Sequence, residues 1–220
     1  MDFLIDSPIS ETNFNEIINF LDLNETDTVI DIGCGRGTLL LSLFNSYQCR
    51  GVGVDISNGR IEVARQRTGN NEQIELHLSD INDFPQDRRF DLVSCFGNWN
   101  GFPGLSLMRE FATQDALFLC GINYWRQDPH GEYETHFGID ESELVFKTLS
   151  QQIDSFYDLG FEVLYMYTST QQELDLYQSY IWKARSYKTP LDSREAKLRY
   201  VNWIREYHGW SAWILRRRSF

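Results

Sequence analysis

The stretch TVIDIGCGRGTLLLSLF, residues 28–44, decides how the rest of this sequence is interpreted. It begins with a run of β-branched residues, Thr28 to Ile32, which is typical of a strand buried on both faces of a parallel sheet. A turn with glycine at every second position follows, and then leucines at helical spacing. This order of strand, glycine turn and helix predicts a pocket in which backbone N–H groups and the helix N-terminus face a ligand.

The spacing of the glycines narrows the kind of ligand. Gly33, Gly35 and Gly37 form G-x-G-x-G, whereas the dinucleotide fingerprint G-x-G-x-x-G would need its third glycine where Thr38 stands. A phosphate-binding P-loop would need a Lys after the glycines, and this turn has none. Phosphate is therefore not the favoured ligand, and a dinucleotide oxidoreductase is disfavoured. A tight turn that only packs a helix closely is the structural alternative.

A carboxylate ends the next expected strand. Residues 51–56 are apolar apart from Asp55, which follows the glycine turn by about 20 residues, the position of the acidic ribose ligand in nucleotide-binding sheets. There its two oxygens could accept hydrogen bonds from both ribose hydroxyls of an adenosine. The alternative is that Asp55 is only the N-cap of the helix that follows.

With these features the chain resembles the class I S-adenosylmethionine-dependent methyltransferases. The first motif of that family is an acidic residue two positions before a G-x-G-x-G turn, and Asp31 with the three glycines matches it. The resemblance covers about residues 13–168 and implies S-adenosylmethionine as the cofactor. It also implies that Ile56 packs on the adenine.

The third expected strand, residues 74–78, is followed by a further family feature. The resemblance implies that Asp80 takes the adenine amino group and that Ile81 supplies a backbone N–H to the ring; alternatively, Asp80 only belongs to a turn. The expected cofactor-binding residues are Asp31, Gly33, Cys34, Gly35, Gly37, Asp55, Ile56, Asp80, Ile81 and Phe96.

The loops after the fourth and fifth strands are expected to face the methyl group, because ligands bind beyond the carboxyl ends of parallel strands. The fourth strand, residues 90–96, leads into GNWNGF, which lacks the two prolines of [DN]-P-P-[YFW]. That departure argues against a DNA-adenine or protein-glutamine methyltransferase. The expected substrate-binding residues are Asn98, Trp99, Tyr124 and Trp125. For Tyr124 and Trp125, which follow the strand at 116–122, packing at the sheet edge is an equal alternative.

No catalytic residue stands out. Methyl transfer from a sulfonium needs chiefly an in-line nucleophile held in a dry site, so positioning can supply much of the rate. If the acceptor must lose a proton, the candidate bases are His130, His136, Tyr124 and His208. The surface is the commoner place for such histidines.

An aromatic insertion separates the last two expected strands, residues 161–168 and 211–215. Some 40 residues lie between them and contain two predicted helices, 173–185 and 193–207, with many Tyr and Trp side chains. Residues 171–210 are interpreted as a cap over the substrate side. The alternative is that the aromatics form the buried face of two packed helices.

Composition limits the class and the partners. The chain has 220 residues and 42% hydrophobic residues, enough for one domain, residues 1–220. Its net charge of −12 argues against a nucleic-acid partner. Four cysteines without a C-x-x-C pair predict reduced thiols and no metal site. No signal peptide or apolar run long enough to cross a bilayer stands out, so we expect a cytoplasmic protein without a membrane partner.

The sequence therefore predicts an α/β fold: a Rossmann-like, seven-stranded, mostly parallel sheet with helices on both faces, an antiparallel last strand, and a helical insertion between strands six and seven. The expected function is methyl transfer from S-adenosylmethionine to a nitrogen or oxygen of a small molecule. The alternative is a catalytically silent S-adenosylmethionine-binding subunit that supports a partner enzyme.

Overall fold

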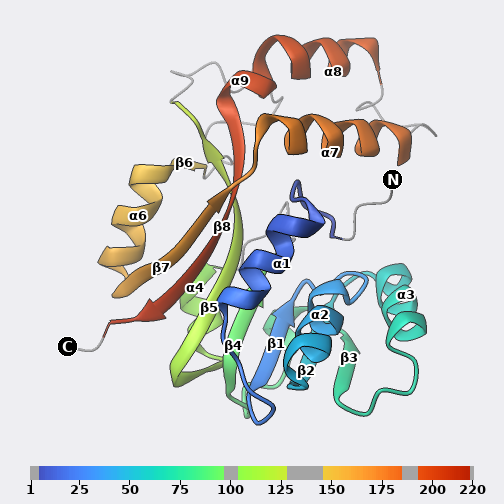
Figure 1. Cartoon of the computed structure of the whole chain (residues 1–220), viewed down its shortest axis with the longest axis vertical. Helices are drawn as coiled ribbons and strands as arrows, with labels where there is room; N and C mark the ends of the chain where they lie inside the picture. Colours follow the sequence, from blue (N-terminus) through green and yellow to red (C-terminus); the bar gives the residue numbers. More distant parts are fainter. Residues whose placement is uncertain (1–4, 97–103, 128–145, 185–192, 219–220) are drawn as a thin grey trace.

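A mixed β-sheet runs through the chain in the computed structural model (Figure 1), which describes residues 5–96, 104–127, 146–184 and 193–218. The strands are β1 (Thr28–Ile32), β2 (Arg50–Asp55), β3 (Ile74–Leu78), β4 (Phe90–Cys95), β5 (Ala112–Trp125), β6 (Lys147–Thr148), β7 (Phe161–Thr168) and β8 (His208–Arg217). Their main order is β3-β2-β1-β4-β5-β8-β7. The first five strands pair in parallel, and β8 runs antiparallel to both β5 and β7. The expected fold class is confirmed.

The short strand β6 adds to the seven expected strands and pairs in parallel with the end of β5. The spacing of Leu144, Leu149, Ile153 and Phe156 predicts a helix over residues 143–159, but the helix begins at Leu149, as α6 (Leu149–Asp158). A capping box sets this boundary: Thr148 Oγ1 accepts from the backbone N–H of Gln151, and the Gln151 side chain accepts from the N–H of Thr148. Residues 143–145 lie outside the described ranges.

Strands β5 and β8 are longer than the apolar runs 116–122 and 211–215 predict. Their ladder extends to the pair Trp125 and His208, so the strand continues where the sequence shows polar and aromatic residues. A glycine just after the predicted helix 193–207 favours Gly209 as a helix end, but Gly209 lies inside β8. A Cβ atom on it would come within 2.4 Å of the Tyr124 ring, so the close approach of that ring requires glycine.

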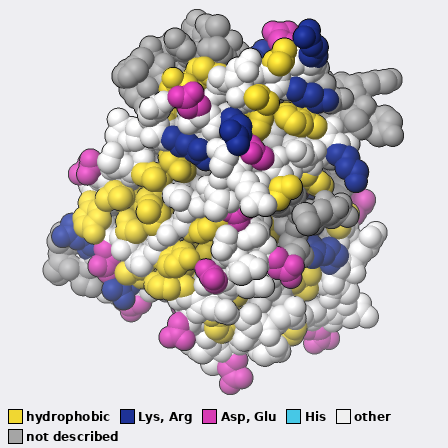
Figure 2. All heavy atoms as spheres, turned by 45° about the horizontal axis from the view of Figure 1, so that its top comes forward, with side chains coloured by type: hydrophobic (Ala, Val, Ile, Leu, Met, Phe, Trp, Pro, Cys, Tyr) yellow, Lys and Arg dark blue, Asp and Glu magenta, His cyan; other side chains and the backbone are white. Residues whose placement is uncertain are grey.

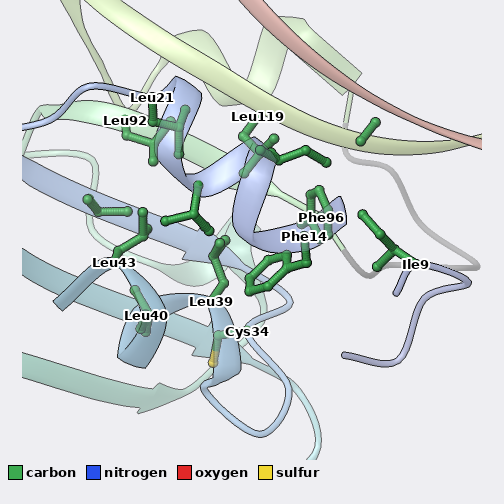
Figure 3. Close-up of a cluster of buried hydrophobic side chains, with 14 of the residues drawn as sticks. Ile9, Phe14, Leu21, Cys34, Leu39, Leu40, Leu43, Leu92, Phe96 and Leu119 are labelled. Carbon is green, nitrogen blue, oxygen red and sulfur yellow. The ribbon is translucent and has the colours of Figure 1, made fainter. Parts of the chain in front are cut away.

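Helices cover both faces of the sheet. They are α1 (Glu11–Phe20), α2 (Thr38–Tyr47), α3 (Asn58–Thr68), α4 (Gly104–Arg109) and α6. The helix α1 begins at the expected N-cap Ser10. Side chains of α1, α2 and α3 form one buried cluster with alternate residues of the strands, whereas α4 and α6 form a second cluster on the opposite face. Figure 3 shows part of the first cluster, in which Phe14 and Phe96 lie together beside Leu39.

The insertion consists of α7 (Gln171–Ala184), α8 (Arg194–Arg199), a π-helical turn (Tyr200–Ile204) and α9 (Arg205–Tyr207), and it lies at one end of the molecule (Figure 1). Asp175 joins its parts, because its carboxylate accepts a hydrogen bond from the Tyr200 hydroxyl at 2.8 Å and pairs with the Arg205 guanidinium at 3.0 Å. Several insertion aromatics are buried, as the packing alternative expects: Tyr177, Tyr200 and Trp203.

Candidate functional site

The glycine turn joins β1 to α2 in a conformation that requires glycine. Gly33, Gly35 and Gly37 have φ angles of 74°, 55° and 71°, in the left-handed region that side chains disfavour. The turn is fixed to the neighbouring strand, because the N–H groups of Gly33 and Cys34 both donate to the Val54 carbonyl, at 2.7 and 3.1 Å. The turn therefore places three residues without side chains at the carboxyl edge of the sheet.

Asp55 at the end of β2 turns back toward this turn. One carboxylate oxygen accepts from the N–H of Gly35 at 2.8 Å, and the other accepts from the N–H of Ser57 at 2.8 Å. The N-cap of α3 is Ser57, so Asp55 is not the cap of this helix. Its side chain is buried, yet each carboxylate oxygen retains a lone pair that could accept from a ligand hydroxyl.

Asp31 supplies a second buried carboxylate. Its Oδ1 accepts a 2.6 Å hydrogen bond from the Ser94 hydroxyl, and only 3% of the residue is exposed. Burial raises the pKa of Asp31 to about 7; the hydrogen bond from Ser94 opposes this rise and the nearby charge of Asp55 adds to it. The edge of the sheet thus carries two carboxylates that favour a cationic ligand.

A cavity opens beside the glycine turn. Its lining contains some of the expected cofactor-binding residues: Asp31, Gly33, Cys34, Gly35 and Phe96. The lining also contains residues that were not predicted to bind the cofactor: Ile5, Asp6, Arg36, Thr38, Leu39 and Arg60. Arg36 could have been selected from the sequence, because it lies inside the G-x-G-x-G turn. Ile5 and Asp6 gave no sequence signal, since only the fold brings them to this edge.

The other expected cofactor-binding residues are not in the lining of this cavity. Gly37 is the N-cap of α2, and Ile56 follows β2 with 74% of its surface exposed. Asp80 caps a short 3₁₀ helix (Ile81–Asp83) and accepts from the backbone and side-chain nitrogens of Asn82. The turn that was the alternative for Asp80 is therefore present. An adenine contact by Ile56, Asp80 or Ile81 stays a prediction.

Tyr124 and Trp125 end β5 in buried positions outside the cavity lining. The Tyr124 ring lies against Gly209, and Trp125 packs edge-on against Trp203 with ring centroids 6.1 Å apart. These contacts match the edge-packing alternative, while a role in substrate binding stays a prediction. The other proposed substrate residues and loop histidines, Asn98, Trp99, His130 and His136, lie outside the described residues.

His208 is a buried member of the list of candidate bases. Its Nε2 lies 3.1 Å from Asn123 Oδ1, and the two residues sit on neighbouring strands. Burial lowers the pKa of His208 to about 4, with a smaller contribution from the positive charge of Arg126. The imidazole is therefore neutral at physiological pH, and its contact with Asn123 joins β8 to β5.

The cysteines and acidic residues show no metal centre in the part of the chain that is described. All four thiols are buried and free. No three His, Cys, Asp or Glu side chains gather there in a metal-ligand arrangement. No helix within the described ranges has the length and apolar character needed to cross a bilayer.

Comparison with known proteins shows which domain and which solved structures this chain resembles. A model described as a methyltransferase domain matches residues 29–113. The uncharacterised Escherichia coli protein YjhP is 26% identical over 96% of this chain and 93% of its own length. The X-ray structure of YjhP aligns with a TM-score of 0.83, covering 99% of this chain and 96% of that one.

A second solved structure extends the likeness of fold. It is an S-adenosylmethionine-dependent methyltransferase from Thiobacillus denitrificans in complex with S-adenosyl-L-homocysteine, 24% identical, with a TM-score of 0.79 over 98% of this chain and 95% of that one. The matched domain contains the glycine turn, Asp31 and Asp55, the residues from which the family was predicted, and that prediction is confirmed. The chain therefore carries a methyltransferase domain and has the fold of S-adenosylmethionine-dependent methyltransferases.

Proposed function

We propose that this protein transfers the methyl group of S-adenosylmethionine to a nitrogen or oxygen atom of a small-molecule acceptor by in-line displacement. The observation that carries the proposal is the cavity at the carboxyl edge of the sheet, lined by the glycine turn and by Asp31 and adjoining Asp55. S-adenosyl-L-homocysteine, which is S-adenosylmethionine without its methyl group, is bound in the similar methyltransferase structure from Thiobacillus denitrificans.

The residues present fit this cofactor by their chemistry. S-adenosylmethionine carries a sulfonium and an ammonium group, and two buried carboxylates, Asp31 and Asp55, favour positive charge. In our assignment Asp31 and the backbone of Gly33, Cys34 and Gly35 hold the amino-acid end. Asp55 takes the ribose hydroxyls. Ile56, Asp80 and Ile81 are assigned to the adenine, and Phe96 to the apolar wall.

The chain's own contribution to the reaction is positioning and the exclusion of water. Burial of the reacting groups strengthens electrostatic interactions, and a fixed in-line geometry removes much of the entropic barrier. The bound cofactor supplies the leaving group, so the protein needs a base only where the acceptor carries a proton. We assign no catalytic base among the described residues.

A small-molecule acceptor is favoured by the insertion and by charge. Residues 171–210 are proposed as a cap over the substrate side, with Asn98, Trp99, Tyr124 and Trp125 as proposed acceptor contacts. The net charge of −12 opposes a polyanionic acceptor. In the view of Figure 2, Lys and Arg side chains are interspersed with Asp and Glu instead of forming a continuous basic surface.

Two further expectations belong to this proposal. The silent-subunit alternative expects Trp99 or Trp125 to plug the methyl-facing space. Trp99 lies outside the described residues, and Trp125 packs against Trp203 and is absent from the cavity lining. The described structure therefore gives that alternative no support from this residue.

The four buried free thiols are compatible with a reducing compartment, and we propose the cytoplasm.

The test combines binding and turnover. Isothermal titration calorimetry would measure S-adenosylhomocysteine binding by the natural protein and by Asp55→Ala, which we expect to weaken affinity at least about tenfold through loss of the ribose contacts. Release of S-adenosylhomocysteine from the methylated donor would then be followed with panels of amines, phenols and carboxylates. Equal affinity of the two proteins would defeat the cofactor assignment. Tight binding with no release above the acceptor-free rate would defeat the enzymatic proposal.

A further inference from the structure

Residues 5–9, which we call the strap, form an outer wall of the cavity through Ile5 and Asp6. The Asp6 carboxylate is paired with two arginines on separate elements. Its Oδ1 lies 3.1 Å from Arg36 in the glycine turn, and its Oδ2 lies 3.6 Å from Arg60 in the first turn of α3. The strap is thus connected directly to the glycine turn and to α3.

The opposite side of the strap is connected to the insertion. The Tyr177 hydroxyl of α7 donates to the Asp6 carbonyl at 2.8 Å, and the Ser169 hydroxyl donates to the Pro8 carbonyl. Just beyond the strap, the N–H of Ser10 donates to the Glu173 carboxylate at 2.7 Å. The strap therefore lies between the cavity and α7.

The hydrogen bonds of Glu173 and the ion pairs of Asp6 differ in strength. Glu173 is only 7% exposed, and its carboxylate accepts from Ser10, Asn13, Tyr167 and Thr170. Buried, fully satisfied carboxylates of this kind hold their partners firmly. Side chains in the Asp6 pairs are much more exposed, at 27% for Asp6, 27% for Arg36 and 49% for Arg60. Ion pairs with such exposure are weak and are screened by salt.

We propose that the partly exposed start of the strap, Ile5 and Asp6, is a gate for the cofactor, latched by the Asp6 carboxylate and anchored by the buried residues Ser7 and Ile9. Entry past Ile5 and Asp6 requires these two residues to move, and this movement breaks the pairs of Asp6 with Arg36 and Arg60 and the hydrogen bond from Tyr177 to the Asp6 carbonyl. The firm contact between Ser10 and Glu173 keeps the start of α1 in place while Ile5 and Asp6 move. This inference rests on the proposed function, because it assigns the cavity to the cofactor.

A gate has a kinetic signature that a binding contact lacks. If exchange occurs only from the open state, a weaker latch raises the association and dissociation rates by the same factor and leaves Kd unchanged. A residue that contacts the ligand directly changes Kd and acts mainly on dissociation. Trp210, whose ring is 5.3 Å from that of the cavity residue Phe96, offers an intrinsic fluorescence signal for binding.

The experiment measures S-adenosylhomocysteine exchange by stopped-flow tryptophan fluorescence in the natural protein, in Asp6→Asn, and in the control Glu162→Gln. The control removes the exposed Glu162–Arg216 pair between β7 and β8, which lies outside the cavity lining. For Asp6→Asn we expect the association rate and the dissociation rate both to rise about three- to fivefold, the size expected for loss of weak ion pairs. Added salt should accelerate exchange in the natural protein and the control, but not in Asp6→Asn.

Unchanged rates in Asp6→Asn would overturn the gate, and so would faster dissociation with a matching loss of affinity. Thermal unfolding of each variant shows that a change in rates does not come from a damaged fold. If the natural protein binds no S-adenosylhomocysteine by calorimetry, the proposed function fails and the gate fails with it. If it binds and the variant's rates do not move, only the gate fails.

Discussion

The hydroxyl of Ser94 in β4 donates to the Asp31 carboxylate in β1 across 2.6 Å, and both side chains are buried at the edge of the cavity. Burial raises the pKa of Asp31 to about 7, so the residue changes charge near neutral pH. A carboxylate in this position can link cofactor binding to proton release, since a cationic ligand stabilises its ionised form.

We expect cofactor affinity to increase about tenfold as pH rises from about 6 to about 8, because the ionised form of Asp31 attracts the cationic cofactor. The variant Asp31→Asn keeps an oxygen for Ser94 but has no charge, so its affinity should be weaker and nearly flat over this range. Calorimetry in buffers of different ionisation enthalpy would measure both affinity and proton release. The same pH slope in both proteins would contradict the prediction.

The raised pKa also has a consequence for stability without ligand. The folded state holds the Asp31 proton to higher pH than the unfolded chain, whose carboxyl titrates near its ordinary value of 3.8. The contribution of Asp31 to stability is therefore present at low pH and is lost as pH rises toward and through 7. Without ligand at about pH 8, Asp31→Asn should unfold at a higher temperature than the natural protein. A lower melting temperature would show that the carboxylate stabilises the empty site.

The glycine turn offers a substitution with a control. Gly35 and Gly69 have φ angles of 55° and 58°, and a Cβ on either would meet nothing within 4 Å, so alanine adds backbone strain of about 1 kcal/mol or more at each. The strain is larger at Gly69, whose ψ angle of −131° lies outside the left-handed helical region. Gly35 lines the cavity, whereas Gly69 is the C-cap of α3. We expect both variants to be less stable by urea unfolding, but cofactor binding to weaken in Gly35→Ala alone. Equal affinities in the two variants would argue against cofactor at the turn.

Glu173 should determine the acid stability of the contact between α1 and α7. Burial alone would raise its pKa, but hydrogen bonds from Tyr167, Thr170, Ser10 and Asn13 lower the pKa to about 2. Its stabilising contribution is therefore present above the ordinary value of 4.5 and is lost as pH falls from there toward 2. Glu173→Gln should lower the free energy of unfolding at neutral pH by about 2–3 kcal/mol, because an amide leaves buried donors unsatisfied. The difference should shrink in acid, and an unchanged difference in chemical denaturation there would refute this assignment.

His208 should contribute a separate acid sensitivity. Because its folded pKa is lowered from 6.5 to about 4, the unfolded chain takes up the proton first, and stability is lost as pH falls through this interval. In His208→Gln, stability should fall less between about pH 7.5 and about pH 5, by about 1–2 kcal/mol. Urea unfolding at the two pH values measures this. Parallel losses in both proteins would mean that the neutral imidazole is not responsible.

The glycine turn and the two carboxylates were predictable from the sequence because each depends on local spacing. Asp55 was recognisable from its distance to Gly35, and the structure joins them by a hydrogen bond. The extent of β5 and β8 was not predictable in this way, since the pairing of Trp125 with His208 arises from the antiparallel ladder and not from an apolar run. The wall formed by Ile5 and Asp6 was also missed, because its partners Arg36 and Arg60 are distant in sequence.

The position of β8 between β5 and β7 has a consequence for synthesis of the protein. Residues 208–217 fill the middle of that half of the sheet, and Trp213 and Ile214 are completely buried in its two cores. While the ribosome is still making the insertion, β5 and β7 lack the strand that joins them and expose unpaired edges, which invite aggregation. The half of the sheet that holds the glycine turn can assemble first, and the half beneath the insertion is completed only after β8 has been made.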